Sequence, residues 1–191
     1  LTIREGILGD TPVSGIGQLL RQFMDITLLK RGPEDLPASS GVLAATVGAC
    51  VAVGLLASGL LPPQPGQPLL LMAIDTLMML FWVWLLLKLA RKPERFLQTS
   101  TGMFGVQLLL SPLFAVALWV FLRAQDDQGQ QLPGAVLILA LGLWALIVTA
   151  RILKSATGWP TFACIALVLA QALVTRGLVL MLYPDIAPAV A

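Results

Sequence analysis

The hydrophobic pattern divides the chain into five long apolar stretches joined by short polar connections. Each stretch approaches the roughly 20 residues that an α-helix needs to cross a lipid bilayer. The pattern predicts five spans, at residues 40–61, 69–87, 101–122, 134–150 and 160–183. No connection is long enough to fold by itself. We therefore expect one five-helix membrane domain over residues 40–183, followed by a short tail at 184–191, and a function carried out in or at the membrane.

A different periodicity precedes the first span. Apolar residues between positions 16 and 29 recur at helical spacing, and polar residues fall on the other faces. Lys30 and Arg31 follow, where cations suit both a helix C-terminus and anionic lipid. This pattern predicts an amphipathic helix at about residues 15–30, within an arm of residues 1–39. The helix either lies in the membrane interface or packs against the bundle.

The composition supports an all-α integral membrane protein. Hydrophobic residues make up 58% of the chain, charged residues 12%, and the mean hydropathy is +0.89, whereas a soluble domain has about 25% charged residues. If the N-terminus is cytoplasmic, every Lys and Arg except Arg123 and Arg176 falls in the arm or in a cytoplasmic connection. The positive-inside rule thus predicts a cytoplasmic N-terminus and an outside C-terminus. We expect a bacterial cytoplasmic (inner) membrane.

The residue inventory argues against most enzyme classes. The chain has no histidine, and its two cysteines, Cys50 and Cys164, both lie in apolar runs. Histidine-based metal sites and Ser-His or Cys-His catalytic pairs are therefore excluded, and no CxxC motif is present. We expect no enzymatic activity, metal or cofactor. Basic residues do not alternate with aromatic ones as a nucleic-acid groove requires, so no nucleic-acid partner is expected.

A carboxylate interrupts the second apolar stretch. Placing an ionisable side chain inside a span costs about 2.5 to 3.5 kcal/mol, so something must compensate Asp75. At 1.5 Å per residue, Asp75 lies about 9 Å below the outer end of its span and Arg176 about 10 Å below the end of the fifth. We predict an ion pair between them. The pair either fixes the helix register or forms a substrate or proton site; alternatively, Arg176 extends alone to the outer surface.

Other polar residues lie deep in the spans. Gln107 and Gln171 are expected to donate hydrogen bonds between helices. In the third span Ser111 is followed by Pro112, which removes a backbone hydrogen bond and predicts a kink. Ser111 or a neighbouring helix could satisfy the freed carbonyl. The kink is either functional or an inert bend.

Small residues follow one face of the first span. They recur at positions i, i+4, i+7 and i+11, as Gly41, Ala45, Gly48 and Ala52. Small residues at this spacing let helices approach closely within a bilayer. The face either packs inside the chain or docks a second protein or a second copy. A weaker pattern of the same kind occurs in the fourth span, at Gly134, Ala135, Gly142 and Ala145.

Two segments resemble the Yip1-like family of five-span membrane proteins. Residues 95–116, RFLQTSTGMFGVQLLLSPLFAV, are similar to the family's entry into its third span, and PEDLPASS, before the first span, is similar to the Asp-Leu-Pro lead-in of bacterial members. The likeness covers residues 32–184. It implies a cytoplasmic N-terminus, an outside C-terminus and a role in protein interaction. Eukaryotic members act with small GTPases in vesicle traffic, but the short arm here points to the bacterial branch.

The sequence therefore favours a non-enzymatic multi-pass protein that acts as an accessory, assembly or scaffold component of a membrane complex. Its partners would be the lipid bilayer and other membrane subunits, or a second copy bound through the small-residue face. The alternative is a small transporter or channel component that uses Asp75 and Arg176 as a polar site within the membrane.

Overall fold

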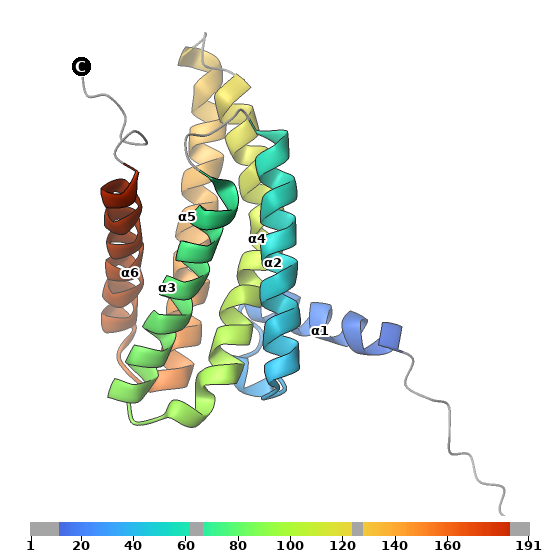
Figure 1. Ribbon diagram of the computed structural model, residues 1–191, viewed down its shortest axis with the longest axis vertical. Coiled ribbons are helices and arrows are strands. Elements are labelled where there is room, and N and C mark those ends of the chain that lie inside the picture. The colour runs from blue at the N-terminus through green and yellow to red at the C-terminus, as the bar shows by residue number, and fades with distance from the viewer. Residues whose placement is uncertain (1–11, 62–66, 124–127, 184–191) are drawn as a thin grey trace, which may run out of the picture.

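The computed structural model describes residues 12–61, 67–123 and 128–183, and these form an all-helical bundle (Figure 1). The elements are α1 (Pro12–Thr27), η1 (Pro33–Asp35), α2 (Ser40–Leu60), α3 (Pro68–Leu89), η2 (Pro93–Arg95), α4 (Phe96–Arg123), α5 (Gln128–Thr157) and α6 (Thr161–Leu182). Five of them, α2 to α6, are long and apolar enough to cross a membrane. The predicted all-α membrane fold with a preceding helix is confirmed.

The two central helices are longer than the hydropathy pattern predicts. Helix α4 has 28 residues and α5 has 30, or about 42 and 45 Å at the helical rise. The hydrocarbon core is only about 30 Å thick, and one end of this pair projects beyond α2 and α3 (Figure 1). Both helices continue through polar residues beyond the apolar stretches at 101–122 and 134–150. A hydropathy pattern does not mark those polar turns as helical. Helices α2, α3 and α6 follow the predicted spans closely.

Tight packing is concentrated in one half of the bundle. Helix α4 is central and contacts α1, α2, α3 and α5. The largest fully buried side chains include Phe104 of α4, Leu87 of α3 and Leu153 of α5. Cys164, near the start of α6, is also fully buried. These residues all lie toward the end of the bundle where α1 crosses it, so the opposite half has fewer fully buried side chains.

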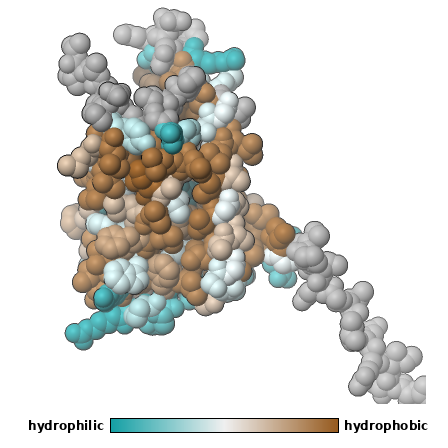
Figure 2. Space-filling view, in the orientation of Figure 1, coloured by the Kyte–Doolittle hydropathy of each residue, from teal (hydrophilic) through white to brown (hydrophobic). Residues whose placement is uncertain are grey.

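Helix α1 lies across the bundle instead of along it (Figure 1). One side is buried, with Phe23 and Ile26 in the core. A second apolar stripe is exposed, at Ile16, Leu20, Met24 and Leu28. In Figure 2 the apolar surface of the bundle continues onto this helix. One face of α1 therefore packs on the bundle, as one of the two alternatives predicts, and contact of the exposed stripe with lipid stays a prediction.

Basic residues gather at the end of the bundle that α1 crosses. In the described segments these are Arg21, Lys30, Arg31, Lys88, Arg91, Lys92, Arg95, Arg151 and Lys154. Hydrophilic surface covers that end in Figure 2. Arg123, at the end of α4, lies at the opposite end, and Arg4 lies outside the described residues. The charges are segregated as the positive-inside argument requires, and the side of the membrane stays a prediction.

Two of these cations complete the C-terminus of α5. Lys92 donates from Nζ to the carbonyl of Thr157 at 3.0 Å, and Arg95 donates from Nη1 to the carbonyl of Ser155 at 2.9 Å. The last carbonyls of a helix have no partner within the helix, and cations suit its negative end. The connection between α3 and α4 is thereby fastened to α5.

Candidate functional site

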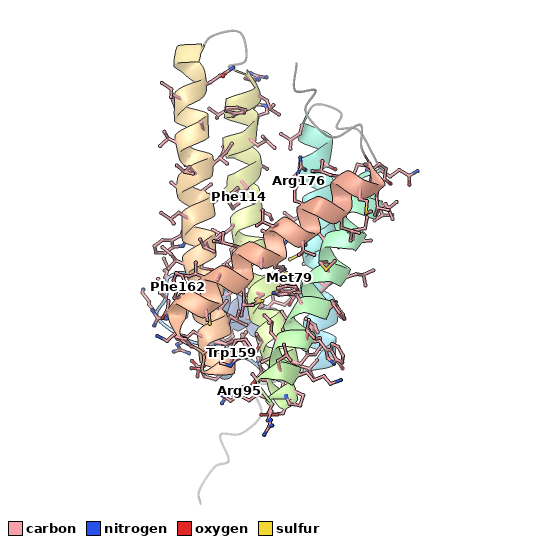
Figure 3. The ribbon with its side chains drawn as sticks, turned by 90° about the vertical axis from the view of Figure 1, so that its left-hand side faces the viewer. Met79, Arg95, Phe114, Trp159, Phe162 and Arg176 are labelled. Atoms are coloured by element: carbon pink, nitrogen blue, oxygen red, sulfur yellow. The ribbon has the colours of Figure 1, made fainter. Side chains whose placement is uncertain are left out.

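A cavity of about 580 Å³ lies between α3, α4, α5 and α6. We call it the membrane cavity. In Figure 3, α6 crosses in front of the bundle, and Met79, Phe114 and Arg176 lie around the space between α6 and the helices behind it. The polar residues that line it are Asp75, Gln107, Ser111, Thr149, Gln171, Thr175 and Arg176. The remaining lining is apolar, as ligand cavities commonly are.

Matching faces of two helices build most of this cavity. Helix α4 contributes Met103, Val106, Gln107, Leu110, Ser111 and Phe114. Helix α6 contributes Val168, Gln171, Ala172, Thr175, Arg176 and Val179. Each set follows the spacing i, i+3, i+4, i+7, i+8 and i+11, which marks one face of a helix. Helix α6 is inclined to α5 (Figure 3), and the two diverge away from the packed end, which leaves room for the cavity.

Asp75 is bonded to α4. The Gln107 amide donates from Nε2 to Oδ2 of Asp75 at 3.4 Å. Both residues also line a second, smaller space of about 250 Å³ between α2, α3 and α4, together with Cys50 and Thr76. The Asp75–Gln107 contact therefore lies between two cavities. Gln107 makes the interhelical bond that the sequence predicts; Gln171 makes none with the described residues.

Arg176 lines the same cavity as Asp75 but does not pair with it. Within residues 12–61, 67–123 and 128–183 the structure has a single ion pair, between Arg31 and Asp25 at 3.4 Å. The predicted Asp75–Arg176 ion pair is thus not formed. Helices α3 and α6 contact each other, but the Asp75 carboxylate accepts a hydrogen bond from Gln107 instead of pairing with Arg176. Asp75 and Arg176 are both exposed. The second predicted role, a polar site formed by the two residues, is therefore the one that we develop below.

The proline in α4 leaves a carbonyl that Ser111 satisfies. Pro112 lies inside α4 and has no N–H to donate to the carbonyl of Leu108. The Ser111 hydroxyl donates to that carbonyl at 3.3 Å. Ser111 also lines the membrane cavity.

The small-residue face of α2 points away from the rest of the chain. Gly41, Ala45, Gly48 and Ala52 are all exposed, and a Cβ added at Gly48 would meet nothing within 4 Å. Helix α2 instead contacts α4 through residues such as Cys50, whose thiol donates to the Phe104 carbonyl at 3.0 Å. Packing inside the chain therefore does not explain this face.

In the fourth span one small residue does pack closely. A Cβ added at Gly134 would lie 2.7 Å from the backbone of Phe121 on α4, whereas one added at Gly142 would meet nothing within 4 Å. The absence of a side chain at Gly134 lets α4 and α5 approach each other. The weaker pattern thus includes one close helix contact and one open position.

The sequence analysis missed Thr149 and Thr175 as members of the site. Thr175 could have been predicted from its spacing. It lies four residues after Gln171, as Ser111 lies four residues after Gln107, so each pair shares one helix face. In the described part of the chain no three His, Cys, Asp or Glu residues cluster closely enough to hold a metal ion. The arrangement offers one carboxylate, one guanidinium and several neutral polar groups, and is suited to binding a polar molecule.

Comparison of the chain with protein-family models, with curated proteins and with solved structures finds no match.

Proposed function

We propose that the protein is a small transporter or channel component that binds a zwitterionic solute in the membrane cavity. The observation that carries the proposal is that Asp75 and Arg176 line one cavity, carry opposite charges and do not neutralise each other. Each charge within a span is costly unless compensated. A solute with one cationic and one anionic group would compensate both.

The size and lining of the cavity support binding. Its volume of about 580 Å³ lies within the roughly 300 to 1,000 Å³ usual for small-molecule sites. Gln171, Thr175 and Arg176 make no side-chain hydrogen bond or ion pair with other described residues, so their donors are free for a ligand. The Ser111 hydroxyl donates to a backbone carbonyl instead of to Asp75. We therefore propose binding without chemical conversion of the solute.

Uptake into proteoliposomes tests this function. The purified protein would be reconstituted, and the entry of radiolabelled α-amino acids, tested one at a time, would be measured. We expect uptake of at least one of them, and its loss in both Asp75→Asn and Arg176→Gln. Glu94→Gln and Arg123→Gln are matched controls, because they remove the same charges outside the membrane cavity. If no amino acid enters, or if the controls lose as much uptake as the cavity variants, the proposed function is wrong.

A second candidate function rests on the exposed small-residue face of α2. We propose that Gly41, Ala45, Gly48 and Ala52 can dock a helix of another membrane subunit or of a second copy, as an accessory or scaffold component would. Gly48→Leu should release such a partner without unfolding the protein, because space is open there. Gly142→Leu is the matched control on α5, where space is also open. Equal co-purification with both variants would remove this candidate.

The orientation of the chain in the membrane and its family are also proposals. We propose a bacterial cytoplasmic membrane, a cytoplasmic N-terminus and a Yip1-like ancestry, supported by the segregation of basic residues and by the sequence segments that resemble that family. A periplasm-dependent reporter fused after the C-terminus should be active, and one fused before the N-terminus should be inactive.

A further inference from the structure

A second polar cavity lies at the basic end of the bundle, away from the membrane cavity. It measures about 350 Å³ and is enclosed by the turn that follows α1 and by the last third of α5. We call it the interfacial cavity. Its charged lining consists of Lys30, Arg31, Glu34, Asp35 and Arg151. Ser155 adds a hydroxyl. Of the apolar lining residues, Ile26, Val148 and Ile152 are buried in the core and Leu29 is partly exposed.

Two of the three cations are available to a ligand. Arg31 pairs with Asp25 at 3.4 Å. Lys30 and Arg151 are exposed, and neither side chain has a hydrogen-bond or ion-pair partner in the ranges that the structure describes. They come from opposite walls, since Lys30 follows α1 and Arg151 belongs to α5. Both line the cavity, and Lys and Arg are good partners for phosphate oxygens.

The position of the cavity indicates where its ligand comes from. The turn that forms one wall directly follows α1, whose exposed apolar stripe ends at Leu28. An amphipathic helix of this kind lies at the boundary between headgroups and acyl chains. Leu29, the one apolar lining residue that is partly exposed, directly follows this stripe, so one molecule with a polar head and an apolar tail could contact both the charges and the stripe. A bilayer phospholipid has this form.

The carboxylates restrict the kind of headgroup. Glu34 and Asp35 line the same cavity as the cations and could only accept hydrogen bonds from a ligand. A hydroxyl or a primary ammonium could donate to them, but a quaternary ammonium has no N–H. We propose that the interfacial cavity binds a phospholipid headgroup, with the phosphodiester between Lys30 and Arg151 and the headgroup's hydrogen-bond donor facing Glu34 and Asp35.

Native mass spectrometry of the full-length protein in detergent tests the proposal. The probes are phosphatidylglycerol and phosphatidylethanolamine, which have donors, and phosphatidylcholine, which does not. We expect both donor-bearing lipids to bind at least tenfold more tightly than phosphatidylcholine. Each cation contributes about fivefold to the affinity. Lys30→Gln combined with Arg151→Gln should therefore weaken the binding of both lipids about 30-fold. Lys88→Gln with Arg91→Gln is the matched control, because it removes two cations from the same end but outside this cavity.

The carboxylate variant provides an independent test. Glu34→Ala with Asp35→Ala removes both acceptors and keeps both cations, so binding of phosphatidylglycerol and phosphatidylethanolamine should fall to within threefold of phosphatidylcholine. Soluble glycerophosphoethanolamine separates a lipid ligand from a free phosphate ester, and should bind at least 100-fold more weakly than the intact lipid.

Three results would overturn the proposal. The first is equal affinity for all three lipids in the unaltered protein. The second is an equal loss in the Lys88 and Arg91 control, which would show diffuse charge attraction. The third is a soluble headgroup that binds as tightly as the lipid. None of these readouts depends on solute uptake, so this proposal and the proposed function can fail separately.

Discussion

Replacing Gly134 by Ala adds one methyl group at a close contact between α4 and α5. The new Cβ would lie 2.7 Å from both the nitrogen and the Cα of Phe121, closer than carbon atoms pack. The neighbouring atoms are backbone, so one helix has to move. Overpacking of this kind costs about 1 to 3 kcal/mol. The same substitution gains about 1 kcal/mol of helix propensity, so its net effect lies between about zero and a loss of about 2 kcal/mol.

Gly142→Ala isolates the steric part of this effect. It is the same substitution in the same helix, but its Cβ meets nothing within 4 Å. The propensity gain is common to both variants, so their difference in unfolding free energy should be about 1 to 3 kcal/mol, with Gly142→Ala the more stable. Reversible unfolding in mixed detergent and SDS micelles, followed by circular dichroism, measures both. Equal stabilities would refute the close approach of α4 and α5 at Gly134.

The remaining stability predictions concern the basic end and the Asp75 contact. Arg91 follows Ala90, the C-cap residue of α3, and lies in the left-handed region at φ 57°. Arg91→Gly should therefore stabilise the protein by about 1 kcal/mol in the same unfolding assay, and Arg91→Ala should not. Arg95→Met removes the charged donor to the Ser155 carbonyl at 2.9 Å and should cost about 1.5 to 3 kcal/mol; an unchanged unfolding midpoint would contradict this capping. Gln107→Leu should cost only about 0.6 kcal/mol, as measured for polar pairs between membrane helices, and a loss above about 2 kcal/mol would show that the Asp75 contact is a major support of the fold.

Hydropathy predicted the five membrane helices because the bilayer imposes a minimum apolar length on every span. It placed the start of the third span at residue 101, whereas α4 begins at Phe96. Thr99, Ser100 and Thr101 are fully buried. A hydropathy scale treats these hydroxyl groups as boundary residues, although neighbouring helices cover them. The ends of α4 therefore depend on packing that local composition does not contain.

The candidate site was predicted only in part, for a similar reason. Depth along each helix can be counted from the sequence, and it brought Asp75 and Arg176 together as candidates; both line the membrane cavity. Which side chains of α3 and α6 meet depends on helix tilt and rotation, which sequence spacing does not encode. The ion pair was therefore predicted where the structure has a cavity. Rotation about the helix axis is equally hidden, and the small-residue face of α2 proved to be exposed.

The most direct test of the central proposal is whether water reaches the membrane cavity. Thr175→Cys places a thiol on the cavity lining of α6, and Leu173→Cys places one on a 73% exposed position that does not line it. Both would be made with Cys50→Ala and Cys164→Ala and treated, in liposomes, with a water-soluble maleimide. We expect the thiol at position 175 to react at least tenfold faster than the one at position 173, which would face lipid. Equal reactivity, or no reaction at position 175, would contradict a water-accessible polar site.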